Sequence, residues 1–265
     1  MMSHLQKNNQ RFFLFLILCI GVTASAFLTK PKPVMYIIGD STVRNGTGKG
    51  GDGLWGWGSI IQDYFDTTRI HIENHAIGGR SSRTFLTEGR WEKILANLKE
   101  GDYVLMQFGH NDGGAINDTS RARGSIKGVG EEMVEIDNLL TKKHETVHSY
   151  GWYMKKYISE AQSKGAIPIV FSLVPRNVWK EGKVQRGNED YGKWAAESAL
   201  ASKALFIDLN EIVAQKYEKL GEEKVRAFFP KDHTHPNYEG AKLNAESVVE
   251  GIKNTSSGLR KYILK

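Results

Sequence analysis

The chain has 265 residues, of which 40% are hydrophobic, 25% charged and 10% aromatic. This composition excludes collagen-like, disordered and disulfide-rich proteins, and it is typical of one sizeable folded domain. The formal net charge is +6, but the basic residues are scattered rather than clustered with aromatic ones, so we expect no nucleic-acid partner.

The first segment has the order of an export signal. Lys7 and Arg11 precede an apolar run over 12–22, and the small residues Thr-Ala-Ser-Ala follow. This order predicts a signal peptide over 1–26 that is removed on export to a periplasm or the medium. An uncleaved anchor is the alternative, but the run has 11 residues and a bilayer needs about 20. The single cysteine, Cys19, lies in this segment, so we expect a mature protein without disulfides. Because the apolar run is removed with the segment, we also expect the mature protein to have no membrane attachment.

After this segment, short apolar runs alternate with longer amphipathic ones. We expect strands over 34–38, 70–74, 103–108, 167–173 and 204–207. We expect helices over 58–65, 90–98, 149–163, 191–201, 209–220 and 237–253. Apolar strands that are each followed by a helix imply a parallel sheet covered on both faces. The sequence therefore predicts a three-layer α/β/α sandwich with a mostly parallel, flavodoxin-like five-stranded sheet, as one domain over 27–265.

A polar segment over 113–147 is too long for a plain connection, and we interpret it as an insertion over the sheet edge. Its two halves, 131–138 and 143–149, alternate in the manner of a β-hairpin. In parallel sheets, ligands gather at the carboxyl ends of the strands. Polar clusters follow four of the predicted strands, at 39–41, 75–80, 109–112 and 175–177, and the first three contain glycine.

A glycine run, "GTGKGG" at 46–51, satisfies the pattern G-x-G-x-x-G, and Asp66 follows at the spacing of a dinucleotide-binding site. In such sites the glycines form the turn directly after the strand, and here residues 39–41 occupy that place. We therefore expect no nucleotide cofactor.

A second pattern, "HETVH", fits the H-E-x-x-H motif of zinc metalloproteases with His144, Glu145 and His148. The extended motif would have a histidine where Met154 stands, and methionine is a poor zinc ligand. On a hairpin strand the two histidines would lie about 13 Å apart and could not share one ion. The zinc protease stays an alternative, although we expect no metal.

Ser41 lies in the stretch "MYIIGDSTVRNG", at the end of the first predicted strand. By itself, Gly-Asp-Ser is equally typical of an Asx turn or a helix N-cap. A serine that closes a strand and opens a helix would present its hydroxyl at the sheet edge and keep its backbone N–H free to donate. This is the position of a nucleophile.

A serine nucleophile needs a base and a carboxylate that orients the base. Asp232 and His235 are three residues apart in a turn-like segment before the last predicted helix. Asp232 can therefore bind one imidazole nitrogen while the other faces Ser41. His233 is the rival base, and an N-cap aspartate with exposed histidines is the alternative interpretation.

Acyl transfer also needs hydrogen-bond donors for the developing oxyanion. The candidates are the Ser41 N–H, a backbone N–H of Gly78 or Gly79, and the Asn111 side-chain amide. Together these residues place serine, glycine, asparagine and histidine, in that order, on four loops at one sheet edge.

That order resembles the SGNH, or GDSL-type, hydrolases, through the blocks "GDST", "NHAIGGRSSRTF", "FGHNDGG" and "DHTHP". The arginine-serine run, "GHNDGG" and "DHTH" are similar to the rhamnogalacturonan acetylesterase family of carbohydrate esterases. The resemblance implies Ser41 as nucleophile, His235 as base, Asp232 as its orienting partner, and an oxyanion hole of Ser41, Gly79 and Asn111. Pro236 departs from the small polar residues that the family more often has after the histidine.

The resulting expectation is a serine esterase that removes O-acetyl groups from pectic polysaccharide, with rhamnogalacturonan as the expected polymer and without a cofactor. Its partner would be an acetylated acidic plant polysaccharide or oligosaccharide. A non-catalytic carbohydrate-binding protein on the same fold is a further alternative. The side chains that we expect to contact substrate are Arg80, Arg83, His110, Trp152 and Arg176. Trp55, Trp57 and Trp179 could also stack on sugars, although we favour core packing for at least half of the four tryptophans named here.

Overall fold

The computed structural model describes residues 31–44, 50, 52–187 and 190–265. The expected signal peptide and all but Gly50 of the glycine run at 46–51 lie outside the described residues. Pro33–Lys265 form one compact unit. Within the described part of the chain, no helix is long and apolar enough to cross a membrane.

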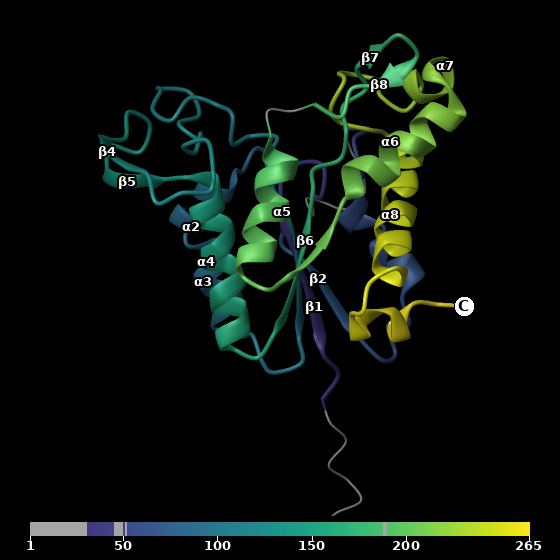
Figure 1. Cartoon of the computed structure of the whole chain (residues 1–265), viewed down its shortest axis with the longest axis horizontal. Coiled ribbons are helices and arrows are strands. Elements are labelled where there is room, and N and C mark those ends of the chain that lie inside the picture. The colour runs from purple at the N-terminus through teal and green to yellow at the C-terminus, as the bar shows by residue number, and fades with distance from the viewer. Residues whose placement is uncertain (1–30, 45–49, 51, 188–189) are drawn as a thin grey trace, which may run out of the picture. The chain divides into compact units, whose positions relative to one another are not determined.

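Five parallel strands form the central sheet, in the order β2-β1-β3-β6-β9 (Figure 1). They are β1 (Val34–Gly39), β2 (His71–Asn74), β3 (Tyr103–Gln107), β6 (Ile167–Phe171) and β9 (Leu205–Ile207). Each overlaps one of the predicted strands, so the prediction of a parallel five-stranded sheet is confirmed.

Both faces of the inner strands are buried, which is why β1, β3 and β6 are mainly apolar, whereas the edge strand β2 is partly exposed and has the sequence His-Ile-Glu-Asn. In β1, Met35 and Ile37 belong to one hydrophobic cluster, whereas Tyr36 and Ile38 belong to another. Successive side chains of a strand point to opposite faces, so the two clusters are the two sides of the sheet.

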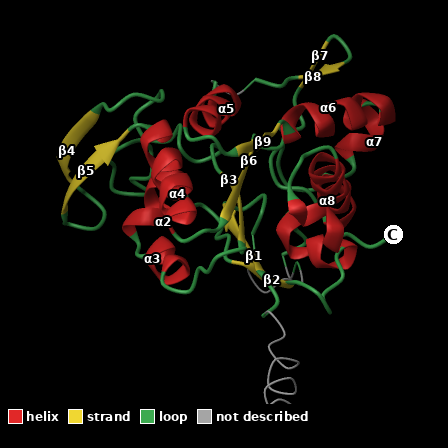
Figure 2. Cartoon of the chain, turned by 60° about the horizontal axis from the view of Figure 1, so that its bottom comes forward, coloured by secondary structure: helices red, strands yellow, loops and turns green. Residues whose placement is uncertain are grey.

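Helices cover both faces, so the predicted three-layer architecture is confirmed (Figure 2). One layer contains α2 (Ser82–Thr87), α3 (Arg90–Leu95), α4 (Tyr150–Ser163) and α5 (Tyr191–Ala201). The other contains α6 (Leu209–Leu220), α7 (Glu222–Arg226), α8 (Tyr238–Lys253) and the 3-10 helices η1 (Trp57–Ser59), η2 (Ile61–Tyr64) and η3 (Gly258–Tyr262).

The prediction of a regular helix over 58–65 is wrong. This segment forms the two short 3-10 turns η1 and η2 instead, with bonds such as Ile60 N–H to the Trp57 carbonyl. Gly56 and Gly58 lie directly against the backbone that follows β1, where a Cβ at either position would come within 2.6–2.7 Å of backbone atoms. This close approach holds the segment in short, tight turns.

The insertion over 113–147 contains an antiparallel hairpin, in the segment where alternation predicts one. Its strands are β4 (Met133–Asp137) and β5 (His144–His148), with Met133 opposite His148. Figure 1 shows this hairpin beside α4. A second, smaller hairpin joins β7 (Trp179–Lys180) and β8 (Lys183–Val184).

Candidate active site

A cleft of about 650 Å³ opens at the carboxyl edge of the sheet. The loops after β1, β2, β3 and β6 line it, together with the insertion and the loop before α8. Its lining includes Ser41, Gly78, Gly79, Arg80, Glu88, His110, Asn111, Arg121, Arg123, Arg176 and His235. Polar loops from distant parts of the sequence therefore meet in one hollow, as the parallel sheet predicts.

Ser41 lies in a tight turn directly after β1. The Val43 N–H donates to the Asp40 carbonyl at 3.2 Å, and the buried Asp40 carboxylate accepts from the Thr42 N–H and hydroxyl at 2.8 Å. Residues 41–43 are a turn and not the start of a helix, which corrects one detail of the prediction. The turn still presents Ser41 to the cleft.

A chain of hydrogen bonds joins Ser41, His235 and Asp232. The Ser41 hydroxyl and His235 Nε2 are 2.7 Å apart, and His235 Nδ1 donates to Asp232 Oδ2 at 2.7 Å. The backbone N–H groups of Thr234 and His235 donate to the other carboxylate oxygen at 2.6 and 2.8 Å. The carboxylate thus holds both the imidazole and the loop that carries it.

The pKa of Asp232 is lowered to about 2. Partial burial acts to raise it, but hydrogen bonds from the His235 ring and from the Thr234 and His235 backbone outweigh burial. Asp232 is therefore ionised at neutral pH, as an orienting partner of an imidazole must be.

The loop before α8 is fixed at several points. The Asn177 N–H donates to the His233 carbonyl at 2.7 Å, and the Trp55 N–H donates to the Pro236 carbonyl at 2.9 Å. Pro236 therefore belongs to the framework of the histidine loop. The rival base His233 accepts a bond from Arg176 Nη1 at 3.1 Å, whereas Ser41 bonds to His235.

The two other expected oxyanion donors, Gly79 and Asn111, line the same cleft as Ser41. Asn111 is 7% exposed and its amide donates to the Arg80 carbonyl at 2.9 Å, which fixes the side chain against the loop after β2. Gly79 has φ of +78°, a conformation that favours glycine.

Residues 37–243 match the GDSL-like lipase/acylhydrolase family. The chain belongs to this family. The match, together with the relatives below, makes the protein a carboxylic ester hydrolase. The family resemblance inferred from the four sequence blocks is therefore confirmed.

Two curated relatives are similar over most of their length. The rhamnogalacturonan acetylesterase of Emericella nidulans is 33% identical over 219 residues, which are 82% of this chain and 84% of that protein. A Bacillus subtilis protein named as a probable rhamnogalacturonan acetylesterase, YesY, is 31% identical over 239 residues, covering 87% and 97%.

Among solved structures, the YxiM protein of Bacillus subtilis matches with a TM-score of 0.70 at 26% identity. The match covers 86% of this chain and 58% of the YxiM chain, so this chain spans less than two thirds of the length of YxiM.

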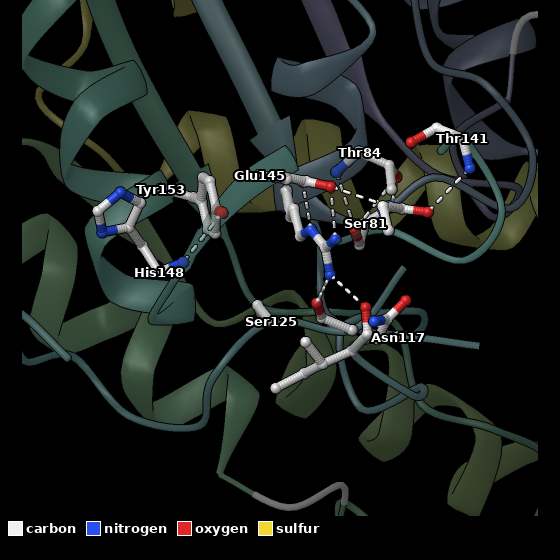
Figure 3. A network of polar contacts seen from close by, with 12 residues as sticks. Ser81, Thr84, Asn117, Ser125, Thr141, Glu145, His148 and Tyr153 are labelled. Carbon is white, nitrogen blue, oxygen red and sulfur yellow. Dashed lines mark hydrogen bonds and ion pairs between the residues drawn. The ribbon is translucent and has the colours of Figure 1, made fainter. Parts of the chain in front are cut away.

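Two of the expected substrate contacts do not line the cleft of this acylhydrolase. Arg83 is 0% exposed and binds Glu145 through two bonds of 2.7 Å. Figure 3 labels Glu145 within this network of polar contacts. Trp152 stacks on His148 with ring centroids 3.8 Å apart. The expectation for Arg83 is wrong, because this buried side chain attaches the hairpin of the insertion, and the Trp152 ring packs against the same hairpin.

The other tryptophans also pack rather than face the cleft. Trp57 is 0% exposed and donates to Gln107 Oε1 at 2.9 Å, and Trp55 and Trp179 pack against the same hydrophobic cluster. None of the four tryptophans is among the described residues that line the cleft.

The cleft is strongly cationic, with four arginines and one glutamate among its lining residues. Arg80 and Arg176 were expected from the sequence, and Arg80 pairs with Glu88 at 3.0 Å. Arg121 and Arg123 were missed. The signal was available, since both belong to the stretch "RARG" of an insertion that was itself expected over the sheet edge.

His110 lines this cleft. Both ring nitrogens are buried and have no hydrogen-bond partner among the described residues. Burial, with Arg176 and His235 nearby, lowers the pKa of His110 to about 4, so its ring is neutral at neutral pH. We therefore find no charge on His110 that could hold an anionic substrate near pH 7.

The H-E-x-x-H stretch lies on β5, not on a helix. His144 bonds Asp137 at 3.0 Å, Glu145 bonds Arg83, and His148 stacks on Trp152. The motif needs both histidines on one helical face, so this geometry does not fit the zinc protease alternative.

Proposed function

We propose that this carboxylic ester hydrolase is a serine esterase that removes O-acetyl groups from an acidic pectic polysaccharide, with rhamnogalacturonan as the expected polymer. The observation that carries the proposal is the hydrogen-bonded chain from Ser41 through His235 to Asp232 at the wall of the cleft. Two relatives, one named as a rhamnogalacturonan acetylesterase and one as a probable rhamnogalacturonan acetylesterase, support the substrate class.

In the first half-reaction, Ser41 Oγ attacks the acetyl carbonyl carbon while His235 Nε2 takes the hydroxyl proton. The ionised Asp232 stabilises the imidazolium that forms. The N–H groups of Ser41 and Gly79 and the Asn111 amide stabilise the oxyanion of the tetrahedral intermediate.

The intermediate then collapses. His235 gives its proton to the leaving sugar hydroxyl, and the acetyl group stays on Ser41 as an ester. Water attacks this ester with His235 again as base, so the sum is one acetate ester and one water converted to a sugar hydroxyl and acetic acid.

The charge of the cleft supports an acidic polymer as substrate. Four arginines and one glutamate line it, and guanidinium groups are well suited to bind carboxylates. A neutral polymer would lack the charge–charge attraction to these arginines.

We also propose that the protein is exported and that residues 1–26 are removed, on the basis of the basic, apolar and small-residue order of that segment. N-terminal sequencing of the exported protein tests this, with Phe27 expected as the first residue.

The central experiment measures acetate release from acetylated rhamnogalacturonan by the native protein and by Ser41→Ala. We expect Ser41→Ala to lose at least about a thousandfold in kcat. A fluorophosphonate should label the native protein at Ser41, and a chelator should leave its activity unchanged.

Two histidine variants distinguish the base from its rival. His235→Ala should lose about 10³-fold or more in kcat, whereas His233→Ala should retain activity within about tenfold. Polymer binding without acetate release by the native protein would instead indicate a carbohydrate-binding protein. Inactivation by chelator without fluorophosphonate labelling would contradict the serine mechanism.

A further inference from the structure

A second hollow, of about 400 Å³, adjoins the cleft. We call it the arginine pocket, and its side chains are His110, Arg123, Leu173, Arg176 and Tyr191, with glycine backbone of the loop after β3. Three of these residues, His110, Arg123 and Arg176, also line the cleft that contains Ser41. A group in this pocket would therefore lie next to an ester bound at Ser41.

Arg123 lies between the pocket and the cleft. Its Nη1 donates to the Gly79 carbonyl at 3.3 Å, and its side chain passes Gly114, whose added Cβ would lie 3.4 Å from Arg123 Cγ. The Asp118 carboxylate holds the turn before it, because it accepts from the N–H groups of Ser120, Arg121 and Ala122 at 2.6–2.9 Å. Arg123 is thus presented on a fixed turn.

Arg176 comes from the opposite side, on the loop after β6. Its Nη1 donates to His233 Nε2 at 3.1 Å, and its buried Nε has no hydrogen-bond partner among the described residues. Neither Arg123 nor Arg176 forms an ion pair with a carboxylate in the part of the chain that the structure describes. Partial burial of two guanidinium groups without an acidic partner costs desolvation free energy, unless a bound anion pairs with them.

The surroundings fit an anion better than a cation. Burial, followed by the charge of Arg121, lowers the pKa of Arg123, although Asp40, Asp112 and Asp118 act to raise it. The carboxylate of Asp118 is already engaged by backbone donors.

We propose that the arginine pocket binds the carboxylate of a uronic acid residue in the acetylated chain. This inference rests on the proposed function. The volume of the arginine pocket lies within the range of ligand sites that hold a sugar-sized group. An acetate ion requires far less space. A planar carboxylate can accept paired bonds from a guanidinium, so the arginine pocket would select substrates by charge.

The test compares an acetylated acidic oligosaccharide with free carboxyls against the same oligosaccharide with methyl-esterified carboxyls. For the native protein, we expect kcat/KM for acetate release to fall about 10- to 100-fold on methyl esterification, as for loss of a charge-assisted hydrogen bond. Arg176→Gln should lose a similar factor on the free acid and little on the methyl ester, so the preference should fall toward one.

Arg123→Gln provides the second variant. Because Arg123 also holds the Gly79 carbonyl, this change is expected to lower activity on both oligosaccharides and, in addition, to reduce the preference for the free acid. Arg226→Gln is the matched control, since Arg226 is exposed on α7 and pairs with Glu222. It should keep the native preference.

The outcomes separate this inference from the proposed function. Acetate release that depends on Ser41 but does not distinguish the two oligosaccharides would overturn the arginine pocket and leave the esterase intact. An unchanged preference in both arginine variants would do the same. Absence of acetate release from either oligosaccharide by the native protein would instead overturn the proposed function.

Released acetate is the other carboxylate that could occupy the arginine pocket. Sodium acetate and galacturonate are therefore compared as inhibitors of the hydrolysis of a neutral phenyl acetate, at equal concentrations. Stronger inhibition by galacturonate that is lost in Arg176→Gln supports the uronate. Equal or stronger inhibition by acetate that is lost in the same variant would overturn the assignment to the substrate chain.

Discussion

Asp112 follows the expected oxyanion donor Asn111 and carries a fully buried carboxyl group. The Ser82 N–H donates to it at 3.1 Å and the Ser125 hydroxyl at 3.2 Å, so it joins the start of α2, the loop after β3 and the insertion. Burial raises the pKa of Asp112 to about 7, and the bonds from Ser82 and Ser125 only partly offset this.

This raised pKa has a consequence for stability. The ordinary value is 3.8, so the folded state holds a proton on Asp112 that the unfolded state has already lost as pH rises past that value. The contribution of Asp112 to stability is therefore greatest below about pH 4 and falls as pH rises to about 7. We predict that Asp112→Asn removes this decline. From about pH 5 to about pH 8, the native protein should lose about 2–3 kcal/mol more of its free energy of unfolding than the Asp112→Asn variant loses.

Urea unfolding at the two pH values measures this difference. Asp118→Asn is the matched control, because the bonds from the Arg121, Ala122 and Ser120 backbone lower the pKa of Asp118 to about 2, and it stays ionised in both states over this range. An equal pH dependence in Asp112→Asn and the native protein would show that Asp112 does not bind the extra proton.

At the scale of elements, one guanidinium attaches the insertion to α2. Arg83 binds the Glu145 carboxylate on β5 and donates to the carbonyls of Ile116 and Gly124 at 2.7 and 2.8 Å. Burial acts to raise the pKa of Glu145, but the bonds from Arg83 and Asn138 lower it, so this carboxylate is ionised at neutral pH. The insertion that carries Arg121 and Arg123 therefore depends on this contact.

We predict that Arg83→Met destabilises the protein by about 3–5 kcal/mol, because it leaves the half-buried Glu145 charge and two carbonyls without their partner. Chemical unfolding measures the loss. The double variant Arg83→Met with Glu145→Gln should recover part of it, since the remaining charge is removed.

Arg226→Met provides the comparison, because it breaks an exposed i,i+4 pair with Glu222 and should cost less than about 1 kcal/mol. If Arg83→Met and Arg226→Met had similar effects, the contact would not be what attaches the insertion.

Periodicity predicted the long elements well and the short ones poorly. The inner sheet strands and α4, α5, α6 and α8 bury continuous apolar runs or stripes, and these patterns can be recognised in the sequence without the structure. The short helix α2 depends on a capping box between Ser81 and Thr84 and on burial of Phe85. Its six residues are too few to show a periodic apolar pattern in the sequence. At 58–65, close backbone packing at Gly56 and Gly58 overrode a helical pattern.

For the molecule as a whole, topology explains which site residues could be predicted. Ser41 and His235 are 194 positions apart. Ser41 follows β1 at the carboxyl edge of the sheet, so topology alone predicted its place. His235 lies in the loop before α8, and it was grouped with Ser41 by its spacing from Asp232 and by the family resemblance. The direction in which a side chain points was not predictable in the same way. Arg83 lies near the site in sequence, but α2 turns it toward the hairpin, whereas the insertion returns Arg121 and Arg123 to the cleft.

The same topology concentrates positive charge at that edge, and this predicts a salt dependence. Four arginines line the cleft of a chain with a formal net charge of +6, so an acidic polymer should be drawn toward Ser41 before it binds. Raising the salt from about 0.01 M to about 1 M shortens the Debye length from about 30 Å to about 3 Å.

We expect kcat/KM on the acidic polymer to fall by about tenfold or more, because capture of a charged substrate is screened. On a neutral phenyl acetate it should change less than about twofold, since no substrate charge is screened. Initial rates of both reactions across the salt series measure this, and a parallel change on the two substrates would show that salt acts on the catalytic groups or on stability rather than on capture.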